Sequence, residues 1–284
     1  MSIVRKSARV GRKLLNTINT VTAFRSARSQ LLLDESVTVA EKALLRNVSL
    51  QIHRNDGMYD PYDPSDARRY LSVGLSAIRA IDNALDKAGT RGGVRSVLDF
   101  PCGHGRVLRF LKVRFSGASI TAAEIDAEGL DFCGREFSVN AVESNVDFKK
   151  VSLPGKFDLI WCGSLVTHTD EKLTGDLLTF FHNHLAPGGT CVFSMHGQFV
   201  IESIESGTQA YGLKPAGIAA LQSQFRSTGY GYADYADHRG YGISVATQER
   251  MALIASGAGR WTRTSFVERG WDDHHDVYGY TLPA

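Results

Sequence analysis

The residues best suited to chemistry in this sequence form a glycine-rich turn after a short apolar run. The run Val97–Phe100 is interrupted only by Asp99, and Gly103 and Gly105 follow with one residue between them. Glycine lets a backbone approach a ligand closely, and a helix that follows offers its N-terminal amides to that ligand. We therefore predict a small-molecule binding loop that uses Asp99, Gly103 and Gly105.

An acidic residue at the end of the next predicted strand narrows the class of ligand. Glu124 lies 19 residues after Gly105, near the spacing at which dinucleotide-binding folds place a carboxylate against the ribose hydroxyls. The NAD pattern requires a small third residue where this chain has Leu108. Asp99 also favours a cationic ligand without phosphates, such as a sulfonium with an amino-acid tail. A cationic nucleoside is thus preferred to a dinucleotide.

Four motifs in this order resemble those of the class I S-adenosylmethionine-dependent methyltransferases. They are LDFPCGHG at 98–105, the acid Glu124, FDLIW at 157–161 and LAPGG at 185–189. The resemblance covers residues 94–196 and implies S-adenosylmethionine as cofactor. Pro101 departs from the glycine that the first motif usually has.

The resemblance also assigns expected roles to the binding residues. The methionine moiety is expected at the loop that contains Asp99, Gly103 and Gly105, and the ribose at Glu124. The adenine edge is expected after the third predicted strand, at Asn145 or Asp147.

The residues after the fourth predicted strand bear on the methyl acceptor. Methyltransferases that act on amino groups of nucleic acids have an Asn/Asp-Pro-Pro-aromatic tetrapeptide there, whereas this chain has CGSL at 162–165. Cys102 after Pro101 resembles the nucleophile of cytosine C5 methyltransferases, but it lies in the cofactor loop. We therefore expect a small-molecule or glycan substrate and no nucleic acid.

Four histidines are expected near the carboxyl ends of the strands, where doubly wound sheets bind ligands. They are His168, His196, His274 and His275. Methylation of a hydroxyl benefits from a general base that titrates near neutral pH, as histidine does. We predict His274, His196 and His168, in that order, as catalytic candidates. A metal site from His196, His274 and Asp272 has no supporting ligand spacing, so no metal is predicted.

A tyrosine-rich segment follows the fifth predicted strand. Residues 199–247 exceed what a crossover requires, and 229–242 contain four tyrosines and four glycines. Glycine-hinged aromatic loops at the mouth of a site often act as lids. We predict that such a lid and its surroundings bind substrate through Tyr230, Tyr232, Tyr235 and Trp271.

These sites need a sheet that brings strand ends together. The strand candidates are Val97–Phe100, Ser119–Glu124, Ala141–Ser144, Phe157–Cys162, Thr190–Ser194, Trp261–Glu268 and Asp276–Leu282. Helical segments near 105–113, 127–138 and 170–185, the last capped by Thr169, alternate with the first five strands, which favours a parallel sheet. The last two strands are joined by seven residues, too few for a parallel crossover. We predict an α/β fold, a doubly wound, mostly parallel seven-stranded Rossmann-like sheet with an antiparallel last strand, N-terminal helices and a lid insertion.

Two segments are expected before the Rossmann-like domain of residues 94–284. Residues 1–33 have seven basic and no acidic residues, with a stripe from Val10 to Val21 that predicts a basic amphipathic helix. Residues 34–93 predict a helical cap. The basic helix, through residues 1–30, predicts contact with a protein partner or an anionic membrane surface, or alternatively packing within the core.

Composition and charge exclude several classes of protein. Of the 284 residues, 43% are hydrophobic and 22% charged, which is typical of a globular chain. The apolar runs are far shorter than the ~20 residues of a membrane-spanning helix, and no secretory signal is recognisable. After residue 33 there are 25 basic and 30 acidic residues, so no basic nucleic-acid surface is expected. We predict a cytoplasmic protein, with peripheral membrane association as an alternative.

These observations predict an S-adenosylmethionine-dependent methyltransferase that acts on a hydroxyl of a small polar molecule or glycan. The sugar preference comes from HDVYGY and PCGHGRVLR, which are similar to a bacterial group of methyltransferases associated with glycan building. Two alternatives stay open. One is a non-catalytic nucleoside-binding or scaffold protein that docks through its basic helix, and the other is an NAD-dependent oxidoreductase.

Overall fold

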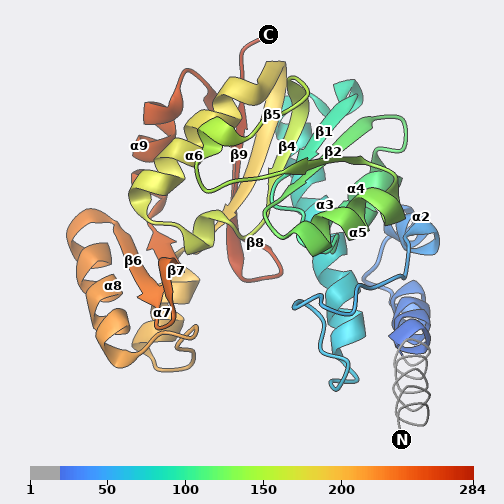
Figure 1. Ribbon diagram of the computed structural model, residues 1–284, viewed down its shortest axis with the longest axis horizontal. Coiled ribbons are helices and arrows are strands. Elements are labelled where there is room, and N and C mark those ends of the chain that lie inside the picture. Colours follow the sequence, from blue (N-terminus) through green and yellow to red (C-terminus); the bar gives the residue numbers. More distant parts are fainter. Residues whose placement is uncertain (1–19) are drawn as a thin grey trace, which may run out of the picture.

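A seven-stranded sheet organises the chain in the computed structural model, which describes residues 20–284 (Figure 1). Its order is β3-β2-β1-β4-β5-β9-β8. The strands are β1 (Ser96–Asp99), β2 (Ser119–Glu124), β3 (Asn140–Glu143), β4 (Phe157–Cys162), β5 (Leu185–Met195), β8 (Thr262–Trp271) and β9 (His275–Thr281). Pairs from β3 to β5 are parallel, and β9 is antiparallel to both β5 and β8. The predicted fold class is confirmed.

The predicted site residues lie where the strands end, at one edge of the sheet. Asp99 at the end of β1 lies opposite Ala122 in β2 and Trp161 in β4. Met195 at the end of β5 lies opposite Asp276 in β9. The β8–β9 connection has three residues instead of the seven predicted, because both strands extend further toward the turn. This edge therefore gathers the ends of β1, β2, β4 and β5 with the β8–β9 turn.

Helices cover both faces of the sheet because alternate strand residues are apolar on each side. Val97 and Leu159 pack with α3 (Asp66–Ala88), α4 (Leu108–Arg114) and α5 (Ala127–Phe137) in one core. Leu98 and Ile160 pack with α6 (Glu171–His184) and α9 (Gln248–Ala258) in the other. A run of buried residues on both faces is characteristic of central parallel strands. No helix within residues 20–284 is long and apolar enough to cross a membrane.

The start of α6 corrects one prediction. Asp170, and not Thr169, caps the helix, since its carboxylate accepts a hydrogen bond from the Leu173 amide at 2.7 Å. Thr169 is buried and its hydroxyl instead bonds the Val166 carbonyl and the Thr174 hydroxyl. An exposed aspartate has the side-chain length and charge to cap, whereas the neighbouring threonine is used by the core.

The described part of the N-terminal basic segment packs into the protein. Residues 20–33 are helical, and Phe24, Ala27 and Leu31 are buried in the core of the α3 face. The Phe24 ring makes edge contacts with Tyr59 and Tyr70. For residues 20–33 the packing alternative is therefore observed. The rest of the predicted amphipathic helix lies outside the described residues.

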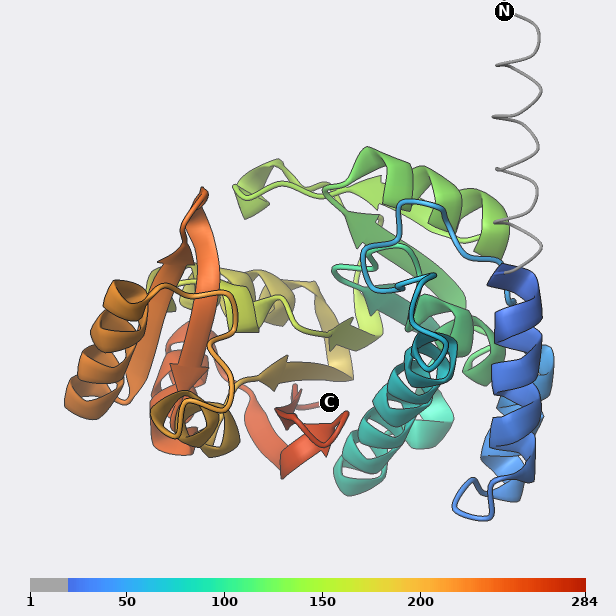
Figure 2. The same cartoon turned by 90° about the horizontal axis from the view of Figure 1, so that it is seen from below.

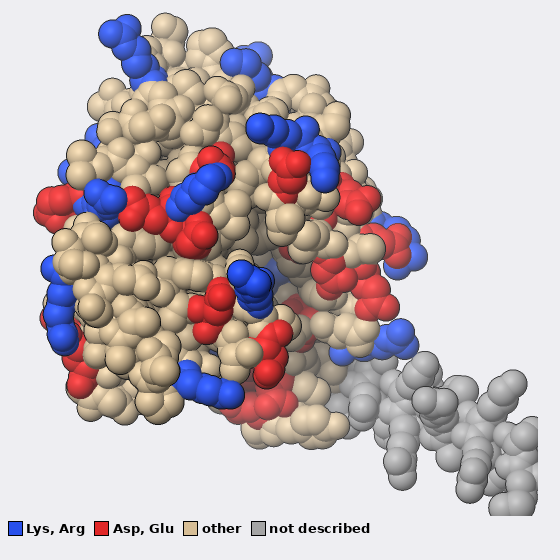
Figure 3. Space-filling view, turned by 60° about the vertical axis from the view of Figure 1, so that its left-hand side comes forward, with Lys and Arg blue, Asp and Glu red and all other residues tan. Residues whose placement is uncertain are grey.

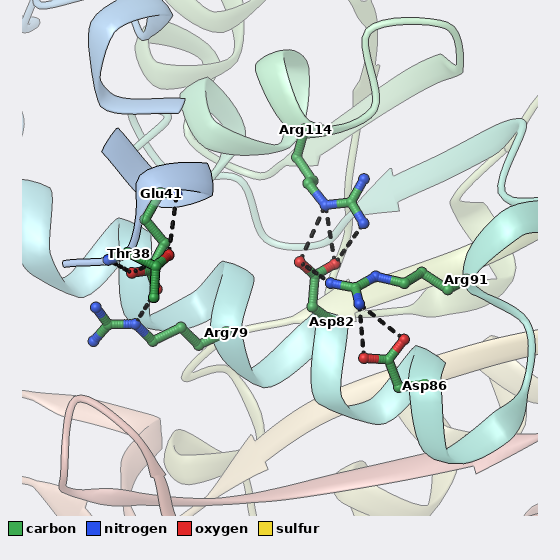
Figure 4. Close-up of polar contacts among 7 residues, drawn as sticks. All are labelled: Thr38, Glu41, Arg79, Asp82, Asp86, Arg91 and Arg114. Atoms are coloured by element: carbon green, nitrogen blue, oxygen red, sulfur yellow. Dashed lines mark hydrogen bonds and ion pairs between the residues drawn. The ribbon is translucent and has the colours of Figure 1, made fainter. Parts of the chain in front are cut away.

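Ion pairs connect the N-terminal helices to one another and to α4 (Figure 4). In α2 (Val39–Asn47), Thr38 and Glu41 form a capping box, and Glu41 also pairs with Arg79 of α3. Asp82 of α3 pairs with Arg114 of α4 and with Arg91. The helices of residues 34–93 are thus ion-paired with α4, the helix that follows the glycine-rich loop.

The insertion after β5 is a small lobe with its own core. It contains α7 (Gln198–Glu205), α8 (Pro215–Thr228), β6 (Tyr230–Tyr235) and β7 (His238–Ala246). Figures 1 and 2 show it at the opposite end of the molecule from the N-terminal helices. The predicted loop at 229–242 is wrong, because most of it is the antiparallel β6–β7 hairpin. Tyr-Gly-Tyr-Ala-Asp-Tyr alternates side chains with period two, which is the pattern of a strand.

Candidate active site

The two glycines after β1 serve different purposes. Gly103 and Gly105 have φ values of +52° and +83°, which side chains rarely adopt. A Cβ on Gly105 would lie 2.4 Å from the Phe137 ring, so this glycine lets α5 pack on the loop. A Cβ on Gly103 would meet nothing within 4 Å. Gly103 therefore exposes bare backbone where a ligand can approach.

Glu124 joins the cofactor loop to the end of β2. One carboxylate oxygen accepts a hydrogen bond from the Gly103 amide at 2.8 Å. The other accepts from the amides of Ile125 and Asp126 at 2.8 and 3.1 Å. Three backbone donors therefore hold the carboxylate at the loop.

Asp99 is a buried carboxylate without a hydrogen-bond partner. Its exposed fraction is 1%, and neither oxygen is bonded within the described residues. Burial raises the pKa of Asp99 well above its usual value, and the nearby Glu124 charge adds to this effect. A cation bound beside Asp99 would stabilise its ionised form. The loop thus fits a ligand with a positively charged group.

Two apolar side chains missed by sequence reasoning stand near Glu124. Ile125 is 56% exposed and Val146 is 70% exposed. The amide of Ser144 bonds the Glu124 carbonyl at 2.9 Å, which brings the ends of β2 and β3 together. The predicted Asn145 accepts a hydrogen bond from the Asp147 amide at 2.9 Å, and Asp147 caps a short turn of helix. Exposed aliphatic side chains at such an edge offer a surface for a flat ring.

A cavity of about 600 Å³ lies at the same edge of the sheet. It is lined by the β8–β9 turn, the end of β5, the segment after β4, the inserted lobe, α3 and Arg106. The three predicted catalytic histidines, His168, His196 and His274, all line the cavity. The predicted substrate residues Tyr235 and Trp271 line it as well. The structure thus brings these five predicted residues to one cavity.

Two predicted substrate residues do not line this cavity. Tyr230 is buried, and its hydroxyl donates to the Thr169 carbonyl at 2.8 Å. The Tyr232 hydroxyl donates to Asp234 at 2.6 Å on the same face of β6. Because side chains alternate along a strand, Tyr235 points to the other face, toward the cavity. Tyr230 and Tyr232 are placed as structural residues of the hairpin.

His168 has one ring nitrogen fixed and the other available. Its Nδ1 lies 2.7 Å from the Gly242 carbonyl oxygen. A carbonyl only accepts, so Nδ1 carries the proton and Nε2 of the neutral ring keeps a lone pair. The ring stacks on Tyr241 at 4.7 Å between centroids. Burial lowers the pKa of His168 below its usual value, so the ring is neutral near pH 7.

The other cavity histidines form a compact group. His196 Nδ1 lies 3.1 Å from the Ser244 carbonyl, and His275 Nδ1 lies 3.2 Å from the Ser194 hydroxyl. Burial lowers the pKa of His196 to about 3, and burial also holds the pKa of His275 well below its usual value. Burial lowers the pKa of His274 too. All three rings are therefore neutral near pH 7.

Comparison with known proteins agrees with this geometry. The family model of a methyltransferase domain matches residues 97–189, which include most of β1, the glycine loop and Glu124. The chain therefore contains a methyltransferase domain. No curated protein matches the sequence of this methyltransferase.

Solved structures similar to this methyltransferase share its fold at low sequence identity. CalS10 from Micromonospora echinaspora, an amino pentose methyltransferase solved with S-adenosylmethionine, has a TM-score of 0.52 at 16% identity, covering 81% of this chain and 99% of that one. DesVI from Streptomyces venezuelae has a TM-score of 0.50 at 17% identity, covering 80% and 100%. A methyltransferase from Clostridium acetobutylicum has a TM-score of 0.50 at 14% identity, covering 73% and 92%.

Two arginines at the cavity of the methyltransferase were also missed by sequence reasoning. The Arg106 guanidinium lies 6.0 Å from the centroids of both Tyr70 and Trp271, without an ion pair to the described residues. Burial lowers the pKa of Arg106. Arg69 of α3 pairs with Asp272 at 3.0 Å. In the sequence, only the position of Arg106 directly after Gly105 indicated a role at the site. Whether its side chain enters the cavity depends on how α3 packs.

Proposed function

We propose that this enzyme methylates a hydroxyl group of a small polar molecule, with a sugar or glycan end as the first candidate. The observation that carries the proposal is the cavity beyond the strand ends, lined by His168 and other histidines and adjoining the cofactor loop. Its hydrogen-bonding groups and its rings, Tyr235 and Trp271, suit a polyol. The similar structure CalS10 is an amino pentose methyltransferase, which supports a sugar-sized acceptor.

The cofactor is proposed to lie along the ends of β1, β2 and β3. The Asp99 carboxylate would face the positive charges of the methionine moiety, beside the bare backbone of Gly103. Glu124 would accept hydrogen bonds from the ribose, and Ile125 and Val146 would contact the adenine faces. Asn145 or Asp147 would meet the adenine edge.

Arg106 is proposed as a ligand of the methionine carboxylate. It directly follows the glycine loop, lines the cavity and has no anionic partner among the described residues. A guanidinium binds a carboxylate through two parallel hydrogen bonds when the geometry allows. This contact would place the tail of the cofactor at the junction of loop and cavity.

His168 is proposed as the general base, ahead of His274 and His196. The Gly242 carbonyl fixes its tautomer, which leaves Nε2 as proton acceptor. His196 has a pKa of about 3 and is therefore a weak base. His274 makes no hydrogen bond to the described residues that would orient its ring.

The reaction would follow from alignment and proton removal. When bound, S-adenosylmethionine supplies a methyl group whose bond to sulfur breaks, with its electron pair leaving on sulfur, as the acceptor oxygen bonds to the methyl carbon. His168 would take the hydroxyl proton at Nε2, while the cavity walls hold the acceptor in line.

The charge of one face of the molecule agrees with a small acceptor. On the face drawn in Figure 3, basic and acidic side chains are interspersed, without one field of positive charge. A polyanionic acceptor is favoured by clustered Lys and Arg. We therefore keep small molecules and glycan ends as the proposed substrates.

Transfer of labelled methyl from S-adenosylmethionine to a panel of sugars and phenols tests this function. We expect a product that is labelled on oxygen and loses at least ~100-fold in rate in His168→Gln, in line with the effect of removing a general base. His184→Gln is the matched control, since His184 is bonded to the Phe180 carbonyl in α6. Turnover with none of the acceptors, or with nucleic acid alone, would contradict the proposal.

A further inference from the structure

We propose that His196, His274 and His275 bind a divalent transition-metal ion, with Zn²⁺ as the first candidate, at the acceptor side of the cavity. The role given to the ion rests on the proposed function, whereas its binding does not.

The three rings converge from two elements. One ring nitrogen from each lies within 4.8 Å of the others. The ring centroids are 4.8 to 5.7 Å apart. Zinc–nitrogen bonds of about 2.0–2.1 Å place tetrahedral ligand atoms about 3.3 Å apart. Side-chain rotations that move each ring nitrogen by about 1 Å would therefore complete the site. Within residues 20–284, no other group of three His, Cys, Asp or Glu side chains has this arrangement.

Two of the three rings, those of His196 and His275, make the kind of hydrogen bond expected of metal ligands. A histidine ligand usually donates its second ring N–H to a carbonyl or another polar group, which fixes its orientation. His196 Nδ1 meets the Ser244 carbonyl, and His275 Nδ1 meets the Ser194 hydroxyl. Ser194 in turn accepts a hydrogen bond from the Ser164 amide at 2.9 Å. Because the Ser244 carbonyl only accepts, Nδ1 of His196 carries the proton and its Nε2 is left as the ligand atom.

The ligand set selects the kind of metal. Imidazole suits Zn²⁺, Cu²⁺ and Ni²⁺, whereas Mg²⁺ and Ca²⁺ prefer oxygen. Three protein ligands and a fourth open position are typical of catalytic zinc. Here the fourth position would face a cavity of about 600 Å³. The ion would therefore have space to bind an oxygen of the acceptor.

Such an ion would make the acceptor hydroxyl easier to deprotonate. The hydroxyl oxygen would bind the metal, its proton would pass to His168, and the same oxygen would form the new bond to the methyl carbon as the carbon–sulfur bond breaks. Metal coordination lowers the pKa of a bound O–H group.

Metal titration of the tag-free, full-length protein tests binding directly. After dialysis against a chelator, we expect one Zn²⁺ per chain in competition with a chromophoric chelator. We also expect Co²⁺ to give the visible absorption of a tetrahedral or five-coordinate site. His196→Gln, His274→Gln and His275→Gln should each weaken Zn²⁺ binding at least ~10-fold. The control His182→Gln, in α6 beside Trp261, should leave Zn²⁺ binding unchanged.

Three results would overturn the proposal. They are no stoichiometric Zn²⁺ or Co²⁺ binding, binding that survives all three substitutions, and binding lost in His182→Gln. Circular dichroism and calorimetric S-adenosylmethionine binding identify variants that fold and keep the cofactor site. Methyl transfer measured with and without Zn²⁺ is a separate readout. Binding of Zn²⁺ without any effect on transfer would overturn the catalytic role of the ion, and failure of transfer under both conditions would instead count against the proposed function.

Discussion

Asp99 is the residue at which stability and function oppose each other. Its buried carboxylate has no partner in the described residues, which is costly for folding unless it is protonated or faces a cation. The same feature makes it suitable for the cationic end of the cofactor. Residues kept in an unfavourable state for a ligand are expected at functional sites.

Asp99→Asn should therefore stabilise the free protein and weaken cofactor binding. Because the folded pKa is raised, the free wild-type protein loses stability as the pH rises from about 4 through that pKa, and the variant should lack this loss. At pH 8 we expect the unfolding free energy to rise by about 1–3 kcal/mol and S-adenosylmethionine binding to weaken by about 1.5–3 kcal/mol. Urea unfolding at pH 5 and pH 8 checks the stability, and calorimetry checks the affinity for S-adenosylmethionine. A variant that is less stable at pH 8 would contradict this reading.

The lowered pKa of His168 sets the pH dependence of catalysis. A general base must be neutral, so kcat/KM should fall as the pH drops through the pKa of the free enzyme. Burial lowers that pKa, so the acid limb should lie below the ordinary histidine value of 6.5. A pH profile of the wild type, compared with His168→Gln at its lower rate, checks this. An acid limb above 6.5, or one retained in the variant, would exclude His168.

At the scale of elements, the β6–β7 hairpin supports the base through Gly242. A Cβ at this position would lie 1.9 Å from the Ala233 carbonyl, across the two strands. Gly242→Ala should therefore displace the carbonyl that orients His168, costing about 1–3 kcal/mol of stability, as overpacking does, and lowering kcat. Gly257→Ala in α9, where a Cβ meets nothing within 4 Å, should instead be neutral or stabilising by about 0.5–1 kcal/mol. Thermal unfolding and turnover of both variants distinguish a specific effect at Gly242 from a general intolerance of alanine in place of glycine.

The elements also show which features could be predicted from the sequence. β2 and β4 were predicted at both ends, because their apolar runs are bounded by polar residues and turns. The convergence of His168, His196 and His274 followed from the rule that parallel strand ends share an edge. The hairpin was missed because its glycines were interpreted as loop signals.

Contacts between distant segments set the remainder of the site. The place of Arg106 depends on α3, where the Trp271 indole donates to the Val73 carbonyl at 3.0 Å. The choice of Tyr235 over Tyr230 and Tyr232 depends on which face of the hairpin the main domain covers. The sequence periodicity does not contain this information.

At the scale of the whole molecule, the helical residues 20–33 belong to the core. Phe24 is fully buried, whereas Leu33 in the same helix is 82% exposed. Phe24→Ala should lower the unfolding free energy by about 3–5 kcal/mol, and Leu33→Ala should change it by less than about 0.5 kcal/mol. Denaturant unfolding of the two variants checks this. Equal, small effects would indicate that residues 20–33 are an appendage.

Calorimetry of the whole chain tests whether its nucleoside ligand is S-adenosylmethionine. In calorimetry, we expect wild-type protein to bind S-adenosylmethionine at one site and to give no binding heat with NAD. Glu124→Ala should weaken S-adenosylmethionine binding by about 1.5–3 kcal/mol, or roughly 10- to 150-fold, because a charged acceptor of ribose hydrogen bonds is lost. Unchanged affinity in Glu124→Ala, or tighter binding of NAD than of S-adenosylmethionine, would contradict the account.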